Sequence, residues 1–258
     1  MTSPNGGLIS LNTGNLRIQM KSSARRMQPI VAAKALKRLI ANPDNTEEVF
    51  AIIRAMSGDS LFKTYKRFQS TETGKKVLDE KRELLETLQD KKRLAQFSAG
   101  SLGHAYLSFV RAEKITAEGL VEASEENVPA ELENQPEEVV AFGKRMRDQH
   151  DLWHVLTGYG RDTFGEVCLL AFTYAQTRNR GLGLIAIVGA FRQYRELGSG
   201  VFKAFFVAYT AGKRAAWLPQ QDWEAMLKDP INEVRQQLNI PRPKVYQRIL
   251  ENFALANA

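Results

Sequence analysis

Residues 149–176, "QHDLWHVLTGYGRDTFGEVCLLAFTYAQ", contain polar side chains that can bind a metal within an otherwise apolar segment. His150 and His154 are four residues apart, so on a helix they share a face, with about 5–6 Å between their β-carbons. Both imidazoles can therefore reach one ion. The chain has only three histidines, and two of them are here. The spacing predicts half of a metal site.

Two carboxylates nearby could complete this site. Asp151 is turned about 100° from His150 on a helix, so it reaches the ion from the edge of the face or orients a histidine instead. Glu166 must come from the next helix, after the turn "GYGRD", in which Gly158 and Gly160 permit a sharp reversal. Two imidazole nitrogens and up to two carboxylates suit zinc, iron(II) or manganese(II).

Each of these residues also has a purely structural interpretation. The histidines could be ordinary hydrogen-bonded polar residues. The segment "TFGE" fits a capping box, in which Thr163 caps the helix and Glu166 binds back to its amide. Asp162 is a competing cap that would leave Glu166 free, and the sequence leaves both alternatives open. We expect His104 to be structural and Cys168 to be an inert buried thiol.

Helical periodicity dominates the chain and predicts an all-α, single-domain helical bundle. In "TEEVFAIIRAMSG", Thr46 is the expected N-cap and Gly58 the end of the helix. The segment "EEVVAFGKRMRDQHDLWHVLTG" predicts one helix that ends at Gly158, and a second helix is expected from about Thr163 to Arg178. Further apolar helices are expected at about 182–197, 200–216, 221–227, 230–238 and 241–254.

Charge divides the 258 residues into unlike parts. Residues 1–43 hold seven bases and no acid, and we interpret residues 1–27 as a basic flexible arm that is either a solvated tail or a binder of anionic surfaces. The helical domain spans residues 28–258. It contains an acidic connector at 117–140, with eight glutamates and no base.

A single cysteine excludes an intramolecular disulfide and fits a reducing compartment.

The motif "HDLWH", followed after eleven residues by "E", resembles the signature of the Coq-four family of ubiquinone (coenzyme Q) biosynthesis proteins. The following "GE...L.AF..AQT" extends the resemblance. A weaker similarity covers roughly residues 28–215, through "TEEVFAIIRAMSG", "TGKKVLDEKRELLETL" and "SLGHAYLSFV". The chain departs from the family pattern in its acidic stretch and in its longer tail beyond Trp217, which puts any family partner surface there in doubt.

The resemblance implies an all-helical peripheral membrane protein that removes the ring carboxylate of a polyprenylated hydroxybenzoate, the quinone precursor. It also implies that His150, Asp151, His154 and Glu166 are the catalytic residues and hold one divalent metal per chain. Zinc is the usual family assignment, with iron or manganese as alternatives. The apolar segments "LGLIAIVGAF" and "VFKAFFVAYTA" could line a groove for the prenyl lipid or fill the core.

The implied partners are an anionic membrane surface and other ubiquinone biosynthesis proteins; we also expect a homo-oligomer and no nucleic acid. The implied location is the cytoplasmic side of a bacterial inner membrane, or the matrix side of the mitochondrial inner membrane in a eukaryote.

One alternative function is that of a non-catalytic scaffold that binds polyprenyl lipids. Another is a phosphohydrolase of the HD type, for which His104 and Asp222 are poor candidates for the additional ligands that such a site needs.

Overall fold

The computed structural model describes residues 26–42, 45–113 and 135–257. Every regular element in these ranges is a helix, and one isolated antiparallel bridge joins Ser101 to Pro230. The all-α prediction is confirmed. The basic arm lies outside the described residues except for residues 26–27, and so does most of the acidic connector. Residues 137–140, which were assigned to the connector, belong to a helix.

Within residues 26–42 and 45–113, seven helices precede the acidic connector and form the first part of the fold. They are α1 (Pro29–Ala41), α2 (Thr46–Ser57), α3 (Ser60–Gln69), α4 (Glu72–Asp79), α5 (Leu84–Gln89), α6 (Lys91–Gln96) and α7 (Leu102–Ala112). The predicted cap of α2 is wrong by one residue. Asn45 occupies the N-cap, and its side-chain oxygen accepts the Glu47 amide at 3.0 Å, because asparagine caps at least as well as threonine.

The remaining elements follow the connector. They are α9 (Glu137–Asp148), α10 (His150–Thr157), α11 (Thr163–Thr177), α12 (Arg180–Leu197), α13 (Gly200–Arg214), the 3-10 helix η1 (Leu218–Gln220), α14 (Trp223–Met226), α15 (Ile231–Gln237) and α16 (Lys244–Ala256). The predicted boundaries of the apolar helices near 182–197 and 200–216 agree with α12 and α13 to within two residues.

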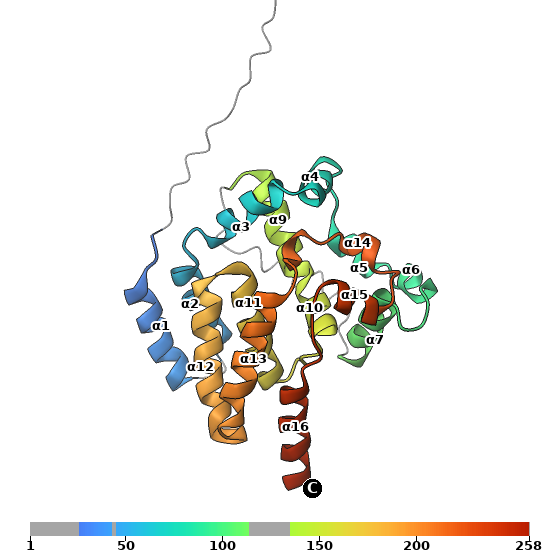
Figure 1. Ribbon diagram of the computed structural model, residues 1–258. Coiled ribbons are helices and arrows are strands. Elements are labelled where there is room, and N and C mark those ends of the chain that lie inside the picture. Colours follow the sequence, from blue (N-terminus) through green and yellow to red (C-terminus); the bar gives the residue numbers. More distant parts are fainter. Residues whose placement is uncertain (1–25, 43–44, 114–134, 258) are drawn as a thin grey trace, which may run out of the picture.

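Helix α11 lies at the centre of the bundle. It packs on α12 and α13, while α1 and α2 cover the far side of α12 and α16 packs on α13 (Figure 1). Cys168, Leu169 and Phe172 of α11 are fully buried, as expected for a helix that is apolar around most of its circumference. None of the described helices is both long and apolar enough to cross a membrane. The groove predicted along α12 and α13 stays a prediction.

A second group of helices, α3, α4 and α9, forms a smaller core around Tyr65, Phe68 and Phe142. An ion pair joins this group to the tail of the chain. Arg145 of α9, which is only 3% exposed, binds both carboxylate oxygens of Glu224 in α14, at 2.7 and 2.8 Å. The pair therefore anchors the helix that leads directly into α10.

The long helix predicted to end at Gly158 is interrupted at Gln149, so the prediction of one continuous helix was wrong. The Gln149 side chain is buried and accepts a hydrogen bond of 2.7 Å from the Trp223 indole. A residue 74 positions away thus contacts the junction between α9 and α10. Gly158 does end the helix, with a left-handed φ of 76°.

We predict that Glu224→Ala lowers the free energy of unfolding by about 3–5 kcal/mol, because it leaves the Arg145 guanidinium buried without a counter-charge. Urea denaturation followed by circular dichroism measures the change. Lys63→Ala is the matched control, since Lys63 forms an exposed pair with Asp59 and should cost only about 0.3–0.5 kcal/mol. Equal losses in the two variants would contradict the structural role of the buried pair.

Candidate metal centre

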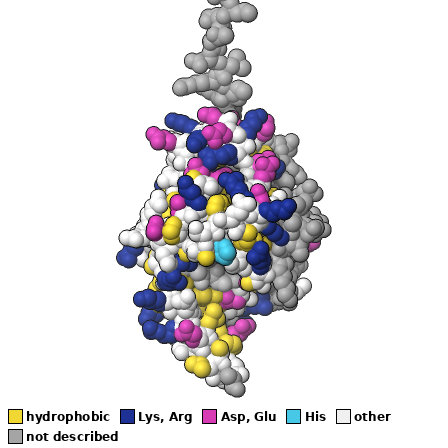
Figure 2. Space-filling model, turned by 90° about the vertical axis from the view of Figure 1, so that its right-hand side faces the viewer, with side chains coloured by type: hydrophobic (Ala, Val, Ile, Leu, Met, Phe, Trp, Pro, Cys, Tyr) yellow, Lys and Arg dark blue, Asp and Glu magenta, His cyan; other side chains and the backbone are white. Residues whose placement is uncertain are grey.

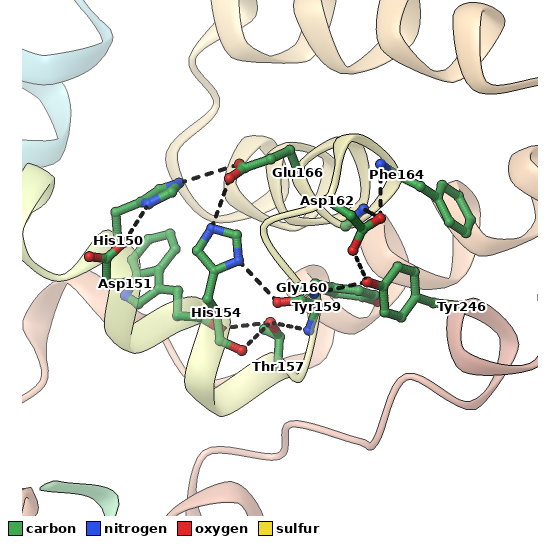
Figure 3. Close-up of polar contacts among 12 residues, drawn as sticks. His150, Asp151, His154, Thr157, Tyr159, Gly160, Asp162, Phe164, Glu166 and Tyr246 are labelled. Atoms are coloured by element: carbon green, nitrogen blue, oxygen red, sulfur yellow. Dashed lines mark hydrogen bonds and ion pairs between the residues drawn. The ribbon is translucent and has the colours of Figure 1, made fainter. Parts of the chain in front are cut away.

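Helices α10 and α11 bring His150, His154 and Glu166 together (Figure 3). The two imidazole rings are 4.7 Å apart between centroids and lie nearly perpendicular, at 78°. The Glu166 carboxylate faces both rings. Its Oε1 lies 3.3 Å from His154 Nε2, and its Oε2 lies 3.9 Å from His150 Nε2. Two imidazole nitrogens and one carboxylate therefore converge from different helices, as the spacing of the motif predicted.

Asp151 lies on the other side of the His150 ring. Its Oδ1 is 3.5 Å from Nδ1 of His150, whereas Glu166 faces Nε2. Candidate ligand atoms of His150, Asp151 and His154 lie within 4.8 Å of one another. Because Asp151 and Glu166 face different nitrogens of His150, an ion on Nε2 would take Glu166 as its carboxylate ligand. Asp151 would then fix the orientation of the ring.

His154 is the most constrained member of the group. Its side chain is fully buried, and its Nδ1 lies 3.0 Å from the Tyr159 carbonyl oxygen, which can only accept a hydrogen bond. Nδ1 therefore carries the proton, and the lone pair of neutral Nε2 points toward the Glu166 carboxylate. Nε2 has no hydrogen-bond partner. A buried lone pair that faces an anion is stabilised by a positive charge between them, either a proton or a metal ion.

The electrostatics of the site agree with this geometry. Burial by itself lowers the pKa of His154, but the negative charge of the nearby Glu166 carboxylate outweighs it and raises the pKa. Burial raises the pKa of Asp151, and the neighbouring His150 and His154 more than offset this, so the net shift is downward. The site therefore favours a negative carboxylate beside positive charge, and its donor set fits a divalent metal.

The turn between the two helices is held by Asp162. One carboxylate oxygen accepts the amides of Phe164 and Gly165, at 3.1 and 2.9 Å, and so caps α11. The other accepts a hydrogen bond from the Tyr246 hydroxyl, which itself accepts the Gly160 amide at 3.0 Å. The side chain of Asp162 thus fixes both the start of α11 and the path of the turn.

This arrangement decides between the two interpretations of Glu166. Asp162 is the N-cap and Thr163 the first helical residue, so Glu166 is not part of a capping box. Its carboxylate is free to face the histidines. The close turn also requires Gly165, because a β-carbon there would lie 2.1 Å from the Gly160 carbonyl oxygen.

Several residues that support the site were missed by the sequence analysis. Arg235 of α15 donates hydrogen bonds to the carbonyl oxygens of Val155 and Leu156, at 2.9 and 2.8 Å. It thereby provides donors for carbonyl groups in the last turn of α10. Phe109 of α7 stacks on His154, with 5.7 Å between ring centroids. Tyr246 is a third such residue. All three are distant in sequence from the motif, and no local pattern points to them.

Other candidate residues have structural roles. Cys168 is fully buried, and burial raises the pKa of its thiol, as expected for an inert cysteine. Asp222 forms an ion pair with Arg82 at 2.8 Å and caps α14. His104 is absent from the cluster of candidate ligands found among the described residues. Neither Asp222 nor His104 supports the HD-type alternative.

The candidate centre is open on one side only. The side chains of His150 and Glu166 are 40% and 34% exposed, whereas that of His154 is completely buried. A histidine side chain also reaches the surface in Figure 2, with hydrophobic side chains beside and below it. A substrate would therefore approach from the side of His150 and Glu166.

Comparison with known proteins identifies the family of the chain. A family profile described as "Coenzyme Q (ubiquinone) biosynthesis protein Coq4" matches residues 19–244. The chain belongs to this family. The match extends well beyond the similarity seen in residues 28–215, and it includes Trp223 and Arg235. The match therefore covers the first part of the tail beyond Trp217, whereas residues 245–258 lie beyond it.

Two similar proteins are named "Ubiquinone biosynthesis protein COQ4, mitochondrial". The one from Podospora anserina is 28% identical over 67% of this chain and 55% of its own length. The one from Clavispora lusitaniae is 23% identical over 82% of this chain and 65% of its own length. The chain thus spans less than two thirds of either relative.

A solved structure from Nostoc punctiforme also resembles the chain. That protein carries a provisional ubiquinone biosynthesis name. It matches with a TM-score of 0.60 and 19% identity, over 83% of this chain and 99% of its own. At this level of identity the likeness concerns the fold alone.

We predict that Asp162→Ala destabilises the protein by about 0.5–2 kcal/mol through the loss of the helix cap. Thr163→Ala, one residue along, should change stability by less than about 0.5 kcal/mol because its exposed side chain caps nothing. Thermal unfolding of both variants measures the difference. A larger loss for Thr163→Ala than for Asp162→Ala would restore the capping-box interpretation.

Proposed function

We propose that this Coq4 chain binds one divalent metal through His150 Nε2, His154 Nε2 and the Glu166 carboxylate, while Asp151 orients His150. The observation that carries the proposal is the buried Nε2 of His154, which has no hydrogen-bond partner and faces a carboxylate oxygen 3.3 Å away. Zinc is the first candidate because two nitrogens and an oxygen leave a tetrahedral position for substrate. Iron(II) and manganese(II) are the alternatives.

The proposed reaction is removal of the ring carboxylate from a polyprenylated hydroxybenzoate in ubiquinone biosynthesis. The family membership supports the pathway, the resemblance to the family implies this reaction, and the donor set is compatible with it. When bound, the ion would act as a Lewis acid that withdraws negative charge from the oxygens of the substrate. In the simple reaction the ring–carboxyl bond breaks, carbon dioxide leaves and the ring carbon takes a proton. In an oxidative version a hydroxyl from dioxygen replaces the carboxylate, carbon dioxide leaves, and an added two-electron reductant reduces the second oxygen atom to water; this version requires a redox metal, which excludes zinc.

Each residue of the site has a separate task in this proposal. His150 and Glu166 form the exposed side, where the ring of the substrate would bind. Asp151 keeps Nδ1 of His150 protonated and so leaves Nε2 available. His154, packed under Phe109, excludes water from the opposite side. The apolar second half of the domain, including exposed Phe191 and Phe206, would accommodate the prenyl tail.

The cellular setting follows from the chemistry of such a substrate. A polyprenylated ring partitions into a bilayer, so we place the protein at a membrane surface as a peripheral protein. Because its relatives have mitochondrial names, the matrix side of the inner membrane is the proposed location in a eukaryote. The bacterial equivalent is the cytoplasmic side of the inner membrane. Other ubiquinone biosynthesis proteins and a second copy of this chain are the proposed partners.

We predict that the purified protein contains about one divalent metal per chain and that the double variant His150→Ala, His154→Ala contains none. Glu166→Gln should bind metal much more weakly, because an amide is a poorer ligand than a carboxylate. Elemental analysis by mass spectrometry measures the metal. His104→Ala, which removes the third histidine, should keep full metal content. Full metal content in the double variant would refute the site.

We predict that the metal-loaded protein converts a polyprenylated hydroxybenzoate in mixed micelles to the decarboxylated ring, detected by liquid chromatography and mass spectrometry. Asp151→Asn should keep the metal at saturation and lower the rate about 10–100-fold, as expected for a residue that orients a ligand. The assay needs both dioxygen-free and aerobic arms, which separate the two reactions. If the loaded protein binds the precursor but forms no product in either arm, the chain is instead a lipid-binding scaffold.

A further inference from the structure

A cavity lies on the other side of the bundle from α6 and α7, where the end of α2, the start of α3 and the α11–α12 turn meet. Its volume is about 880 Å³, and its lining contains none of the candidate metal ligands. Only one acid, Asp59, borders it. The five bases on its lining are Arg26, Lys63, Arg67, Arg178 and Arg180. The cavity is therefore strongly positive.

Most of this charge is not neutralised by the protein. Lys63 pairs with Asp59, with 3.1 Å between Nζ and Oδ1. The four arginines on the lining form no ion pair with a carboxylate within the described residues. Arginines that share one cavity repel one another unless an anion lies between them. The cavity thus offers several guanidinium groups to a ligand of opposite charge.

Neutral contacts hold some of these arginines in place. The Arg67 guanidinium lies 4.0 Å from the centre of the Trp217 ring. Arg178 donates to the Tyr209 hydroxyl at 3.2 Å. Such contacts restrict the side chains without removing their charge, which lowers the entropy lost when an anion binds.

The start of α3 adds a second, independent indication of an anion site. Asp59 occupies its N-cap position, but the side chain makes no capping hydrogen bond. The first amides of α3 therefore have no side-chain acceptor, and a helix N-terminus of this kind attracts anions. Ser60, which also lines the cavity, has a buried hydroxyl without a hydrogen-bond partner. A bound anion would accept hydrogen bonds from the first amides of α3, and from Ser60 once its side chain turns toward the cavity.

We propose that this cavity binds a phosphate group, either free or as part of a lipid headgroup. A phosphate presents several acceptor oxygens at once, which matches guanidinium groups, a hydroxyl and helix amides better than a single carboxylate does. The apolar part of the lining, which includes Met27, Met56 and Trp217, would contact the organic part of the ligand. This binding function is separate from the proposed chemistry at His150 and His154.

The test uses the full chain and two probes. Titration calorimetry with sodium pyrophosphate measures free phosphate binding, and flotation with vesicles containing phosphatidic acid, against vesicles of phosphatidylcholine alone, measures headgroup binding. The double variant Arg67→Gln, Arg178→Gln should weaken binding of the recognised probe about tenfold or more, because two charged hydrogen-bond donors are lost. Ser60→Ala should weaken it by a smaller factor.

The matched control is Arg93→Gln, Arg111→Gln, which removes the same charge from exposed positions on α6 and α7. It should stay within about twofold of the parent because these residues are distant from the cavity. Selective loss with pyrophosphate assigns free phosphate, and selective loss only with vesicles assigns a headgroup. Equal losses in both double variants, or no binding of either probe by the parent, would overturn the proposal. Metal content, measured in parallel, should stay unchanged in every variant.

Discussion

The candidate metal centre depends on how one carboxylate, that of Asp162, is held. One of its oxygens caps α11, and the other accepts the hydroxyl of Tyr246. Because this residue supplies the cap, Glu166 does not have to, and its side chain can face two histidines on the preceding helix. The same hydrogen bonds also fix the short turn between α10 and α11. They therefore determine both how α11 is oriented relative to α10 and where Glu166 lies relative to the two histidines.

The tail of the chain supports this arrangement from three sides. Trp223 binds Gln149 where α10 begins, Arg235 binds the carbonyls where it ends, and Tyr246 holds the following turn. Polar groups buried in this way are costly unless they are paired. Two buried ring nitrogens of α10, Nε1 of Trp153 and Nε2 of His154, have no hydrogen-bond partner, and only that of His154 faces the Glu166 carboxylate. A buried lone pair in this position is stabilised by a positive charge between it and the carboxylate.

Local patterns in the sequence predicted what depends on local interactions. Helical periodicity predicted the all-α fold and the limits of α11 to α13. The four-residue spacing of His150 and His154 predicted that they lie on the same face of a helix. Interactions over long separations could not be predicted. The Gln149 side chain is bound by a residue 74 positions away, and Asp162 is bound by one 84 positions away. The sequence left two rival caps of α11 open, and the hydrogen bonds from the Phe164 and Gly165 amides to Asp162 identify that residue as the cap.

The central claim is that a metal lies between Nε2 of His150, Nε2 of His154 and the Glu166 carboxylate. Anomalous diffraction from crystals of the metal-loaded protein, collected on both sides of the absorption edge of the bound element, tests it directly. The account predicts one strong peak at bonding distance, about 2.0–2.2 Å, from these three groups, with Asp151 hydrogen-bonded to Nδ1 of His150. A peak on Nδ1 of His150 beside Asp151, with Glu166 turned away, would contradict it.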